Sequence, residues 1–382
     1  MADKKPLTVM LVAGEASGDR HAANMFLELK KRVPEVLGVG MGGLKMAEAG
    51  IDVRYDSSHI AVIGLVEVIR HYREIKQALS QMKQIIAKGR PDLLICVDYK
   101  EFNYKLASYA KKCGIKVLFY VSPQVWAWRP GRVIKYGKVI DMMAVIFPFE
   151  TAYYEEHNIP VRYVGHPSVD KVHPDYSREE DFDRFQLNRD YPVVGLLPGS
   201  RRLEIKRMLP VMMESAQCVL EKVPETQFVL PQADSITDEL LQPYLSKSSV
   251  GIKVIKNQPY DVIQCCDAVM TTSGTATLEV ALLNIPMVIT YKLSPMTYWL
   301  GKWLVKSRYI GLPNIIAGKR IIKELIQHQA TARNLSKEIV RILTDQAYRQ
   351  EMRRMLTAVS EELGHGGGSK VMAEIAEKML LR

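Results

Sequence analysis

Short apolar runs of strand length alternate with helix-length segments along most of the 382-residue chain. Continuous apolar strands separated by helices are typical of parallel sheets that are covered on both faces. Nine such runs predict strands, at residues 7–14, 92–98, 116–122, 142–149, 193–200, 227–232, 252–255, 268–274 and 287–292. The pattern therefore predicts an α/β protein with two doubly wound domains that face each other across a cleft.

A stretch rich in proline and charge, residues 165–185, separates the two sets of runs and is interpreted as a linker. We expect an N-terminal domain at 1–168, a C-terminal domain at 186–345 and C-terminal helices at 346–382, because no strand-like run appears near the C-terminus. The glycine cluster at 365–370 and the apolar helix after it suit a hinge followed by a docking helix.

Charge and cysteine content narrow the partners and the compartment. The formal net charge of +10 and the pI near 9.2 favour phosphates, nucleic acid or an anionic membrane. The basic residues form no aromatic-interleaved run of the kind that binds RNA, so we expect no nucleic acid partner. Five cysteines without a CxxC pair indicate reduced thiols in a cytoplasmic protein. No apolar run reaches the ~20 residues of a membrane-spanning helix.

The strand-end segment 271–279, TTSGTATLE, has the residue types of a site for a nucleoside diphosphate. Ser273 is expected to cap a helix whose N–H groups bind phosphate oxygens, and small residues let a phosphate approach the backbone. The expected first turn consists of Gly274, Thr275 and Ala276. Glu279, one turn further on, is placed to accept hydrogen bonds from a ribose. An ordinary capped helix with a solvated Glu279 is the alternative.

A second polar strand end, LPGSR at 197–201, adds Ser200 and Arg201 to the same expected site. Arginine presents a planar fork of N–H donors that matches phosphate oxygens. The alternative is a turn glycine followed by a surface arginine.

Five motifs, in this order and spacing, resemble those of the lipid-A-disaccharide synthases of Gram-negative bacteria: GEASGD, VSPQVWAWR, LLPGSR, SGTATLE and GLPNIIAG. The resemblance covers essentially the whole chain. It implies two Rossmann-like domains of the GT-B type and an inverting glycosyl transfer without a cofactor or metal. The implied reaction joins UDP-2,3-diacylglucosamine to 2,3-diacylglucosamine 1-phosphate through a β(1→6) bond and releases UDP. The C-terminal helices are expected either to pack back on the N-terminal domain or, as the resemblance implies, to be exchanged in a homodimer.

The same resemblance implies catalytic roles for two carboxylates. Asp98, in the strand end VDYKEFN, matches the family's essential aspartate and is the expected base for the acceptor hydroxyl, and Glu15 is the second expected catalytic residue. The family usually has D-x-P-D-F-N here, whereas this chain has Lys100 and Glu101 at the proline and second-acid positions. A loop-orienting Asp98 and a helix-start Glu15 are the alternatives.

Further residues are expected around the two sugars. Ser17 would lie on the acceptor side, and Asn314 would contact UDP. Trp126 and Trp128 flank one residue, so on a strand their indoles would share a face that is either buried or lines the acceptor site. The acidic D-x-D sequence at 181–183 lies in the predicted linker and is expected to be solvated, so no metal site is predicted.

Residues 60–89 combine a helical apolar stripe with a surplus of apolar side chains. The stripe suits packing on a sheet and consists of Val68, Tyr72, Ile75, Leu79, Met82 and Ile86. Beside it, four apolar residues and two cations would form an interfacial surface for anionic lipid: Val62, Leu65, Val66, Ile69, Arg73 and Lys76. The segment 298–308 repeats this pattern with two tryptophans. We expect a peripheral protein on the cytoplasmic face of the inner membrane; the alternative assigns the apolar residues to the core.

Two other function classes fit parts of the pattern. A nucleotide-sugar epimerase shares the two-domain plan, but it would need two acid/base groups around one sugar and no lipid surface. A non-catalytic UDP-sugar sensor would need the phosphate-binding loops but not Asp98.

Overall fold

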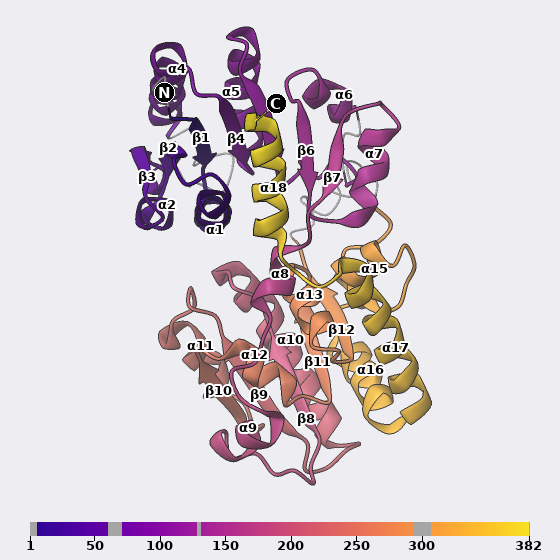
Figure 1. Cartoon of the computed structure of the whole chain (residues 1–382). Coiled ribbons are helices and arrows are strands. Elements are labelled where there is room, and N and C mark those ends of the chain that lie inside the picture. The colour runs from indigo at the N-terminus through magenta and orange to yellow at the C-terminus, as the bar shows by residue number, and fades with distance from the viewer. Residues whose placement is uncertain (1–5, 60–70, 128–130, 294–306, 382) are drawn as a thin grey trace. The chain divides into compact units, whose positions relative to one another are not determined.

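The computed structural model describes residues 6–59, 71–127, 131–293 and 307–381. The chain divides into two compact units, which we call unit 1 (Met1–Pro167 with His365–Arg382) and unit 2 (Ser168–Gly364) (Figure 1). Each unit consists of a parallel sheet with helices, so the predicted α/β class is confirmed.

Among the described residues of unit 1, seven parallel strands form one sheet in the order β3-β2-β1-β4-β5-β6-β7. The strands are β1 (Thr8–Ala13), β2 (Leu37–Gly42), β3 (Ile51–Asp56), β4 (Leu93–Val97), β5 (Lys116–Tyr120), β6 (Met142–Val145) and β7 (Val161–Tyr163). The α-helices are α1 (Ala16–Arg32), α2 (Leu44–Glu48), α4 (Tyr72–Gly89), α5 (Lys100–Lys112), α6 (Arg132–Gly137), α7 (Thr151–Glu155) and α18 (Gly368–Leu381). Chain order reverses between β1 and β4, so the segments after these strands lie at a topological switch point.

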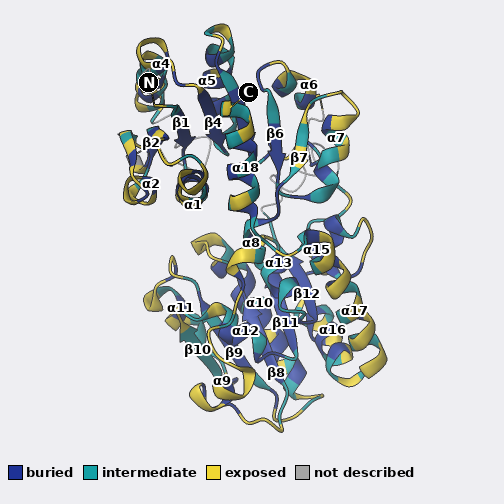
Figure 2. Ribbon diagram, in the orientation of Figure 1, coloured by how far each residue is buried: buried dark blue, intermediate teal, exposed yellow. Residues whose placement is uncertain are grey.

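Alternate residues of the unit 1 strands serve two separate core layers. Met10 of β1 packs in one cluster with Met82 of α4, whereas the neighbouring Leu11 packs in the other with Phe26 of α1 and Met372 of α18. The sheet is therefore buried on both faces, as Figure 2 shows by the dark blue of its central strands. Because side chains alternate along a strand, a continuous apolar sequence is needed to fill both layers.

Unit 2 repeats the plan with six parallel strands among its described residues, in the order β10-β9-β8-β11-β12-β13. The strands are β8 (Val193–Leu197), β9 (Gln227–Gln232), β10 (Ile252–Lys256), β11 (Ala268–Thr272), β12 (Met287–Tyr291) and β13 (Glu324–Ile326). The α-helices are α8 (Pro167–Lys171), α9 (Arg178–Arg184), α10 (Arg202–Leu220), α11 (Asp238–Leu245), α12 (Pro259–Gln264), α13 (Thr275–Leu282), α15 (Leu312–Ile316), α16 (Ala332–Thr344) and α17 (Gln346–Leu363). Here the chain order reverses between β8 and β11.

The stretch predicted as a linker contains the ordered helices α8 and α9. Ser177 caps α9 by accepting a hydrogen bond from the Glu180 amide at 3.3 Å. The expectation that the 181–183 acids are solvated is wrong for Asp181, which is buried and accepts a hydrogen bond from Gln264 Nε2 at 2.5 Å. The described residues hold no group of three or more His, Cys, Asp or Glu side chains that could bind a metal ion.

The C-terminal helix α18, yellow in Figure 1, packs along α1 within unit 1. Arg32 at the end of α1 donates hydrogen bonds to Glu374 at 2.9 Å and to Glu377 at 3.1 Å. The glycine cluster allows a close approach at the start of α18, because a Cβ on Gly368 would lie only 3.0 Å from the Val164 carbonyl oxygen. The glycines thus permit backbone contact with the end of β7.

Candidate active site

The predicted site segments leave neighbouring strands in both sheets. Ala13 of β1 is paired with Val97 of β4, so the segments that carry Glu15 and Asp98 begin side by side. In unit 2, Thr271 of β11 is paired with Leu197 of β8, so the two predicted phosphate-binding segments also begin side by side. Each unit therefore presents one region of candidate residues at the carboxyl ends of its strands, which is where parallel sheets bind ligands.

Asp98 lies in a strained turn between β4 and α5. Asp98 has φ 48° and Tyr99 has φ 45°, a left-handed conformation that costs residues other than glycine roughly 1–3 kcal/mol. Hydrogen bonds hold the turn: the Asp98 amide donates to the Tyr120 carbonyl at 2.9 Å, and Asn103 Nδ2 donates to the Asp98 carbonyl at 2.8 Å. The fold thus fixes the direction in which the half-buried Asp98 side chain leaves the sheet.

Glu15 lies beside this turn and is electrostatically coupled to Asp98. A Cβ on Gly14 would lie 2.2 Å from Tyr99 Cγ, so a glycine is required where the two loops touch. Burial, and then the negative charge of Asp98, raises the pKa of Glu15, whereas Lys100 lowers it. Two coupled carboxylates at a strand end suit proton transfer from a hydroxyl group.

Glu101, at the family's second-acid position, is directed toward α6. Its carboxylate accepts a hydrogen bond from Arg132 at 2.8 Å, and more than half of its side chain is exposed. Helix α6 also contacts Lys100, the residue before Glu101: the Tyr136 hydroxyl donates a hydrogen bond to the Lys100 carbonyl at 2.9 Å. The structure therefore gives Glu101 a partner other than Asp98.

The tryptophan segment after β5 is a turn, so the condition under which the two indoles would share a face, a strand, is not met. The strand ends at Tyr120, and Trp126 is half-buried with its indole Nε1 donating to Glu150 Oε1 at 3.2 Å. Trp128 lies outside the described residues. Ser17 is exposed in the first turn of α1.

In unit 2, helix α13 begins at Thr275, and its cap residue is Gly274 rather than Ser273. The prediction of a Ser273 side-chain cap is wrong, because the Ser273 hydroxyl donates instead to the Ile310 carbonyl at 2.8 Å. Gly274 and Thr275 are exposed and Ala276 is half-buried, so the helix start remains open to an anion.

Glu279 is held by two residues that the sequence did not indicate. Tyr260 donates its hydroxyl proton to Glu279 at 3.2 Å, and Lys171 Nζ lies 3.7 Å from the same oxygen. Lys171 comes from α8, Tyr260 from α12 and Glu279 from α13, so only the fold brings them together. The alternative of a solvated Glu279 is wrong, because only 18% of its side chain is exposed.

The turn after β8 presents Arg201 to solvent. Gly199 has φ +110°, and a Cβ there would lie 2.3 Å from Glu204 Oε2. That oxygen accepts hydrogen bonds from the amides of Ser200 at 3.1 Å and Arg201 at 3.2 Å. The Arg201 side chain is 67% exposed. Glu204 was not predicted from the sequence, and its function here is to shape the turn.

Asn314 is buried and supports the surrounding backbone, so its side chain is not open to a ligand. Its side chain is fully buried, and Nδ2 donates to the Ile322 carbonyl and to Glu324 Oε1, both at 2.8 Å. Its Oδ1 accepts the amides of Ile321 and Ile322 at 2.8 and 2.9 Å, which uses its remaining capacity. Glu324 in turn accepts the Gly311 amide at 2.9 Å. The expected UDP contact of Asn314 is thus replaced by support of the 310–311 backbone that Ser273 contacts.

The expected membrane surface is described only in part. Val62, Leu65, Val66 and Ile69 lie outside the described residues, as do the two tryptophans of 298–308. Arg73 and Lys76 are exposed in the first turns of α4, whereas Met82 and Ile86 are buried, which confirms that part of the helical stripe. Among the described residues, no helix combines the length and apolar character needed to span a bilayer.

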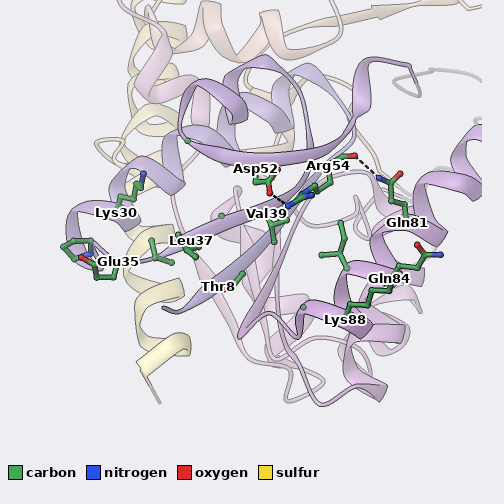
Figure 3. Close-up of a pocket in the computed structure, with 16 residues that line it drawn as sticks. Thr8, Lys30, Glu35, Leu37, Val39, Asp52, Arg54, Gln81, Gln84 and Lys88 are labelled. Atoms are coloured by element: carbon green, nitrogen blue, oxygen red, sulfur yellow. Dashed lines mark hydrogen bonds and ion pairs between the residues drawn. The ribbon is translucent and has the colours of Figure 1, made fainter. Parts of the chain in front are cut away.

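A groove of about 790 Å³ lies at the amino ends of β1 and β2 in the unit 1 sheet, away from the carboxyl ends that carry the predicted site (Figure 3). It is lined by Thr8 and Leu37, at the starts of β1 and β2, and by the edge strand β3, where Arg54 pairs with Asp52 at 2.5 Å. None of the described residues that line it belongs to the predicted site. Because ligands of parallel sheets bind at the carboxyl ends of the strands, we do not assign the active site to this groove.

Solved structures define the class of fold. A kitacinnamycin glycotransferase is similar with a TM-score of 0.66 at 15% identity, covering 98% of this chain and 100% of that one. The UDP-GlcNAc 2-epimerase from Neisseria meningitidis, solved with UDP-GlcNAc, is similar with a TM-score of 0.63 at 15% identity, covering 97% and 99%. The chain therefore has the GT-B type of fold.

Sequence comparison then selects one family within that class. The family described as Lipid-A-disaccharide synthetase matches residues 9–378. A lipid-A-disaccharide synthase from Geobacter sulfurreducens is 47% identical over 380 residues, which cover 100% of this chain and 99% of that protein. The chain belongs to the lipid-A-disaccharide synthase family, which favours the transferase over the epimerase alternative.

Proposed function

We propose that this chain joins UDP-2,3-diacylglucosamine to 2,3-diacylglucosamine 1-phosphate. An acceptor hydroxyl oxygen attacks the anomeric carbon of the donor while the bond from that carbon to UDP breaks. The configuration inverts, a β(1→6) bond forms, and UDP leaves. The strongest support for this reaction is that the family match spans residues 9–378 and so includes the candidate regions of both units.

Asp98 is the proposed base of the reaction. It would accept the proton of the attacking hydroxyl as the new bond forms. The strained turn limits the directions open to its side chain, which favours one orientation toward the acceptor. Burial and the charge of Asp98 raise the pKa of Glu15, and Glu15 would orient the acceptor by hydrogen bonding.

The candidate region of unit 2 is the proposed UDP site. The amides of the exposed residues Gly274 and Thr275, with Arg201, would stabilise the charge that develops on the departing diphosphate. Glu279 would accept hydrogen bonds from the ribose. Lys171 holds this carboxylate in place before the nucleotide arrives, so little reorganisation is needed.

The proposed substrates are acylated, and we place the protein peripherally on the cytoplasmic face of the inner membrane. Arg73 and Lys76, exposed on α4, would contact anionic lipid next to the apolar residues of 62–69. We also propose a homodimer; within a single chain the C-terminal helix α18 packs along α1 of unit 1.

The test is an assay with the two acylated sugars in lipid vesicles, with and without the acceptor. We expect UDP release and a disaccharide 1-phosphate, detected by mass spectrometry, only when both sugars are present. Consumption of the UDP-sugar without the acceptor would support the epimerase alternative and reject the transferase.

A further inference from the structure

A buried carboxylate, Glu150, lies behind the tryptophan turn of unit 1. It ends the short 3₁₀ segment Pro148–Glu150 after β6, and it is only 1% exposed. Its two oxygens have different partners: Trp126 Nε1 donates to Oε1 at 3.2 Å, and the Phe147 amide donates to Oε2 at 3.2 Å. A buried acid is retained only where its oxygens are satisfied, so these donors, together with a backbone hydrogen bond from Ile146, define its position.

A second hydrogen-bonded contact, between Ser122 and Tyr154, holds the turn that carries Trp126. Ser122 donates its hydroxyl proton to the Pro123 carbonyl at 2.8 Å, which leaves its oxygen to accept from the Tyr154 hydroxyl at 2.7 Å. Val121, at the start of this turn, has φ 70°, an unfavourable conformation for a β-branched residue. A strained backbone persists only where the surrounding structure holds it. Here the two hydrogen-bond partners that hold the turn, Glu150 and Tyr154, both come from the segment after β6.

Aromatic rings complete the support of the indole. Trp126 meets Phe149 edge-on with ring centroids 5.5 Å apart, and Phe147 and Phe149 are stacked at 5.5 Å. The ring centroids of Phe147 and His166 lie 4.9 Å apart. The indole is thus held by its N–H and by its ring contact with Phe149, while Trp126 as a whole stays half-buried.

We propose that Glu150 is a positioning residue, which holds the Trp126 indole as one wall of the acceptor-sugar site. This inference rests on the proposed function, in which unit 1 binds the acceptor. Glu150 is too deeply buried to touch a sugar, so it acts only through the indole. Sugars commonly pack against aromatic faces, and a fixed indole reduces the ordering cost of binding.

The charge of this group changes near neutral pH. Burial raises the pKa of Glu150 to about 7, against lowering by the Phe147 and Trp126 hydrogen bonds and by the charge of Lys100. His166 and Tyr154, the other titratable groups near Glu150 and Trp126, do not change charge near pH 7. Burial lowers the pKa of His166 to about 4 and raises the pKa of the Tyr154 hydroxyl.

Ionisation of Glu150 has opposite consequences for stability and for the indole. The folded pKa lies above the ordinary value of 4.5, so its contribution to stability is fully present below about 4.5 and is lost as the pH rises through 7. Only the ionised form, however, offers acceptor oxygens to both N–H donors without a competing O–H. The acceptor should therefore bind better at pH 8 than at pH 6.

The decisive experiment compares Glu150→Gln with the wild-type chain over pH 6–8. Glutamine has the same shape but one acceptor oxygen, so we expect the KM for 2,3-diacylglucosamine 1-phosphate to rise about tenfold at pH 8. Its pH dependence should flatten, and the KM for the UDP-sugar should not change. Trp126→Phe should raise the same KM and flatten its pH dependence to the same extent. The double variant should show no larger rise in this KM than either single variant.

The matched control is Tyr154→Phe, which removes the other hydrogen-bonded contact that holds the same turn. This variant should keep the pH dependence of the acceptor KM. An equal rise in both KM values in Glu150→Gln, or a wild-type pH dependence in that variant, would reject the positioning role and leave Glu150 a structural residue.

A readout that does not need turnover separates this inference from the proposed function. Tryptophan emission of the wild-type chain should shift between pH 6 and 8, and the shift should disappear in Trp126→Phe. A persistent shift in Trp126→Phe would overturn the inference even if the transferase assay succeeds. Failure of the wild-type assay with the expected shift intact would reject the proposed reaction but keep the Glu150–Trp126 coupling.

Discussion

The strand-end regions of the two units occupy equivalent places in equivalent sheets, but their chemistry differs. The unit 1 region brings Glu15 next to Asp98 on a strained backbone, and burial raises the pKa of Glu15. The unit 2 region exposes Arg201 and the start of α13, and it neutralises Glu279 with Lys171. Proton transfer benefits from partly buried acids, whereas phosphate binding needs accessible donors. One sheet topology therefore supports either task, and the loops decide which.

The largest effect should come from Asp98→Asn in unit 1. Asparagine keeps the shape of the side chain but cannot take the hydroxyl proton, so kcat should fall about a thousandfold. UDP affinity, measured by calorimetry, should stay at the wild-type value because unit 2 is unchanged.

Glu101→Gln is the matched control for the second acid. Glu101 is paired with Arg132 at 2.8 Å and largely exposed, so its loss should cost far less activity than the loss of Asp98. Equal losses in the two variants, or a loss of UDP binding in Asp98→Asn, would contradict the assignment of the base.

The second effect concerns the stability of unit 2. It distinguishes an Asn314 that supports the backbone from an Asn314 that contacts UDP. Asn314→Ala removes four buried hydrogen bonds and leaves the Glu324 carboxylate without one donor. The free energy of unfolding should fall by about 3 kcal/mol, as measured by urea denaturation. A variant with wild-type stability and weak UDP binding would instead support a direct contact between Asn314 and UDP.

These residues illustrate what the sequence could and could not predict. Each of the nine apolar runs contains or matches a strand, because a strand buried on both faces must be continuously apolar. The missed β2 is rich in glycine, and a Cβ on Gly40 would lie 1.8 Å from the Leu11 carbonyl oxygen, so close packing weakens the apolar signal. The missed β3 is an edge strand in which apolar and polar residues alternate, so it lacks a continuous apolar run. The missed β7 and β13 have only three residues each.

The site was predictable where its residues follow strands directly, and not elsewhere. Asp98 and Arg201 stand at strand ends, so the rule that ligands bind there indicates them from sequence. Lys171 reaches Glu279 from more than a hundred residues away, and Glu150 reaches Trp126 from a different loop. No local pattern encodes such contacts, which depend on the tertiary fold. Asn314 was misplaced for the same reason, since its burial is invisible in the motif.

A third, smaller effect is expected for Arg201→Ala. The guanidinium is 67% exposed on a turn that Glu204 shapes through backbone amides, so its removal should leave stability within about 0.5 kcal/mol. Loss of a charge-assisted hydrogen bond to phosphate should weaken UDP binding about tenfold in calorimetry. Unchanged affinity would remove Arg201 from the donor site and weaken the contrast between the two regions.

The smallest effect should appear at the lipid surface, where a single exposed cation contributes about 1 kcal/mol of attraction to an anionic membrane. Lys76→Ser should therefore lower the partition coefficient onto phosphatidylglycerol vesicles, measured by sedimentation, about fivefold at low salt, and neutral vesicles should show no change. Lys88→Ser is the matched control, because Lys88 is also exposed but lies in the last turn of the same helix α4. If membrane attraction reflected only the net charge of +10, both variants would lose binding equally. A specific loss in Lys76→Ser would instead locate the lipid contact at the start of α4, and thus within the unit whose half-buried carboxylates Glu15 and Asp98 we assign to the acceptor.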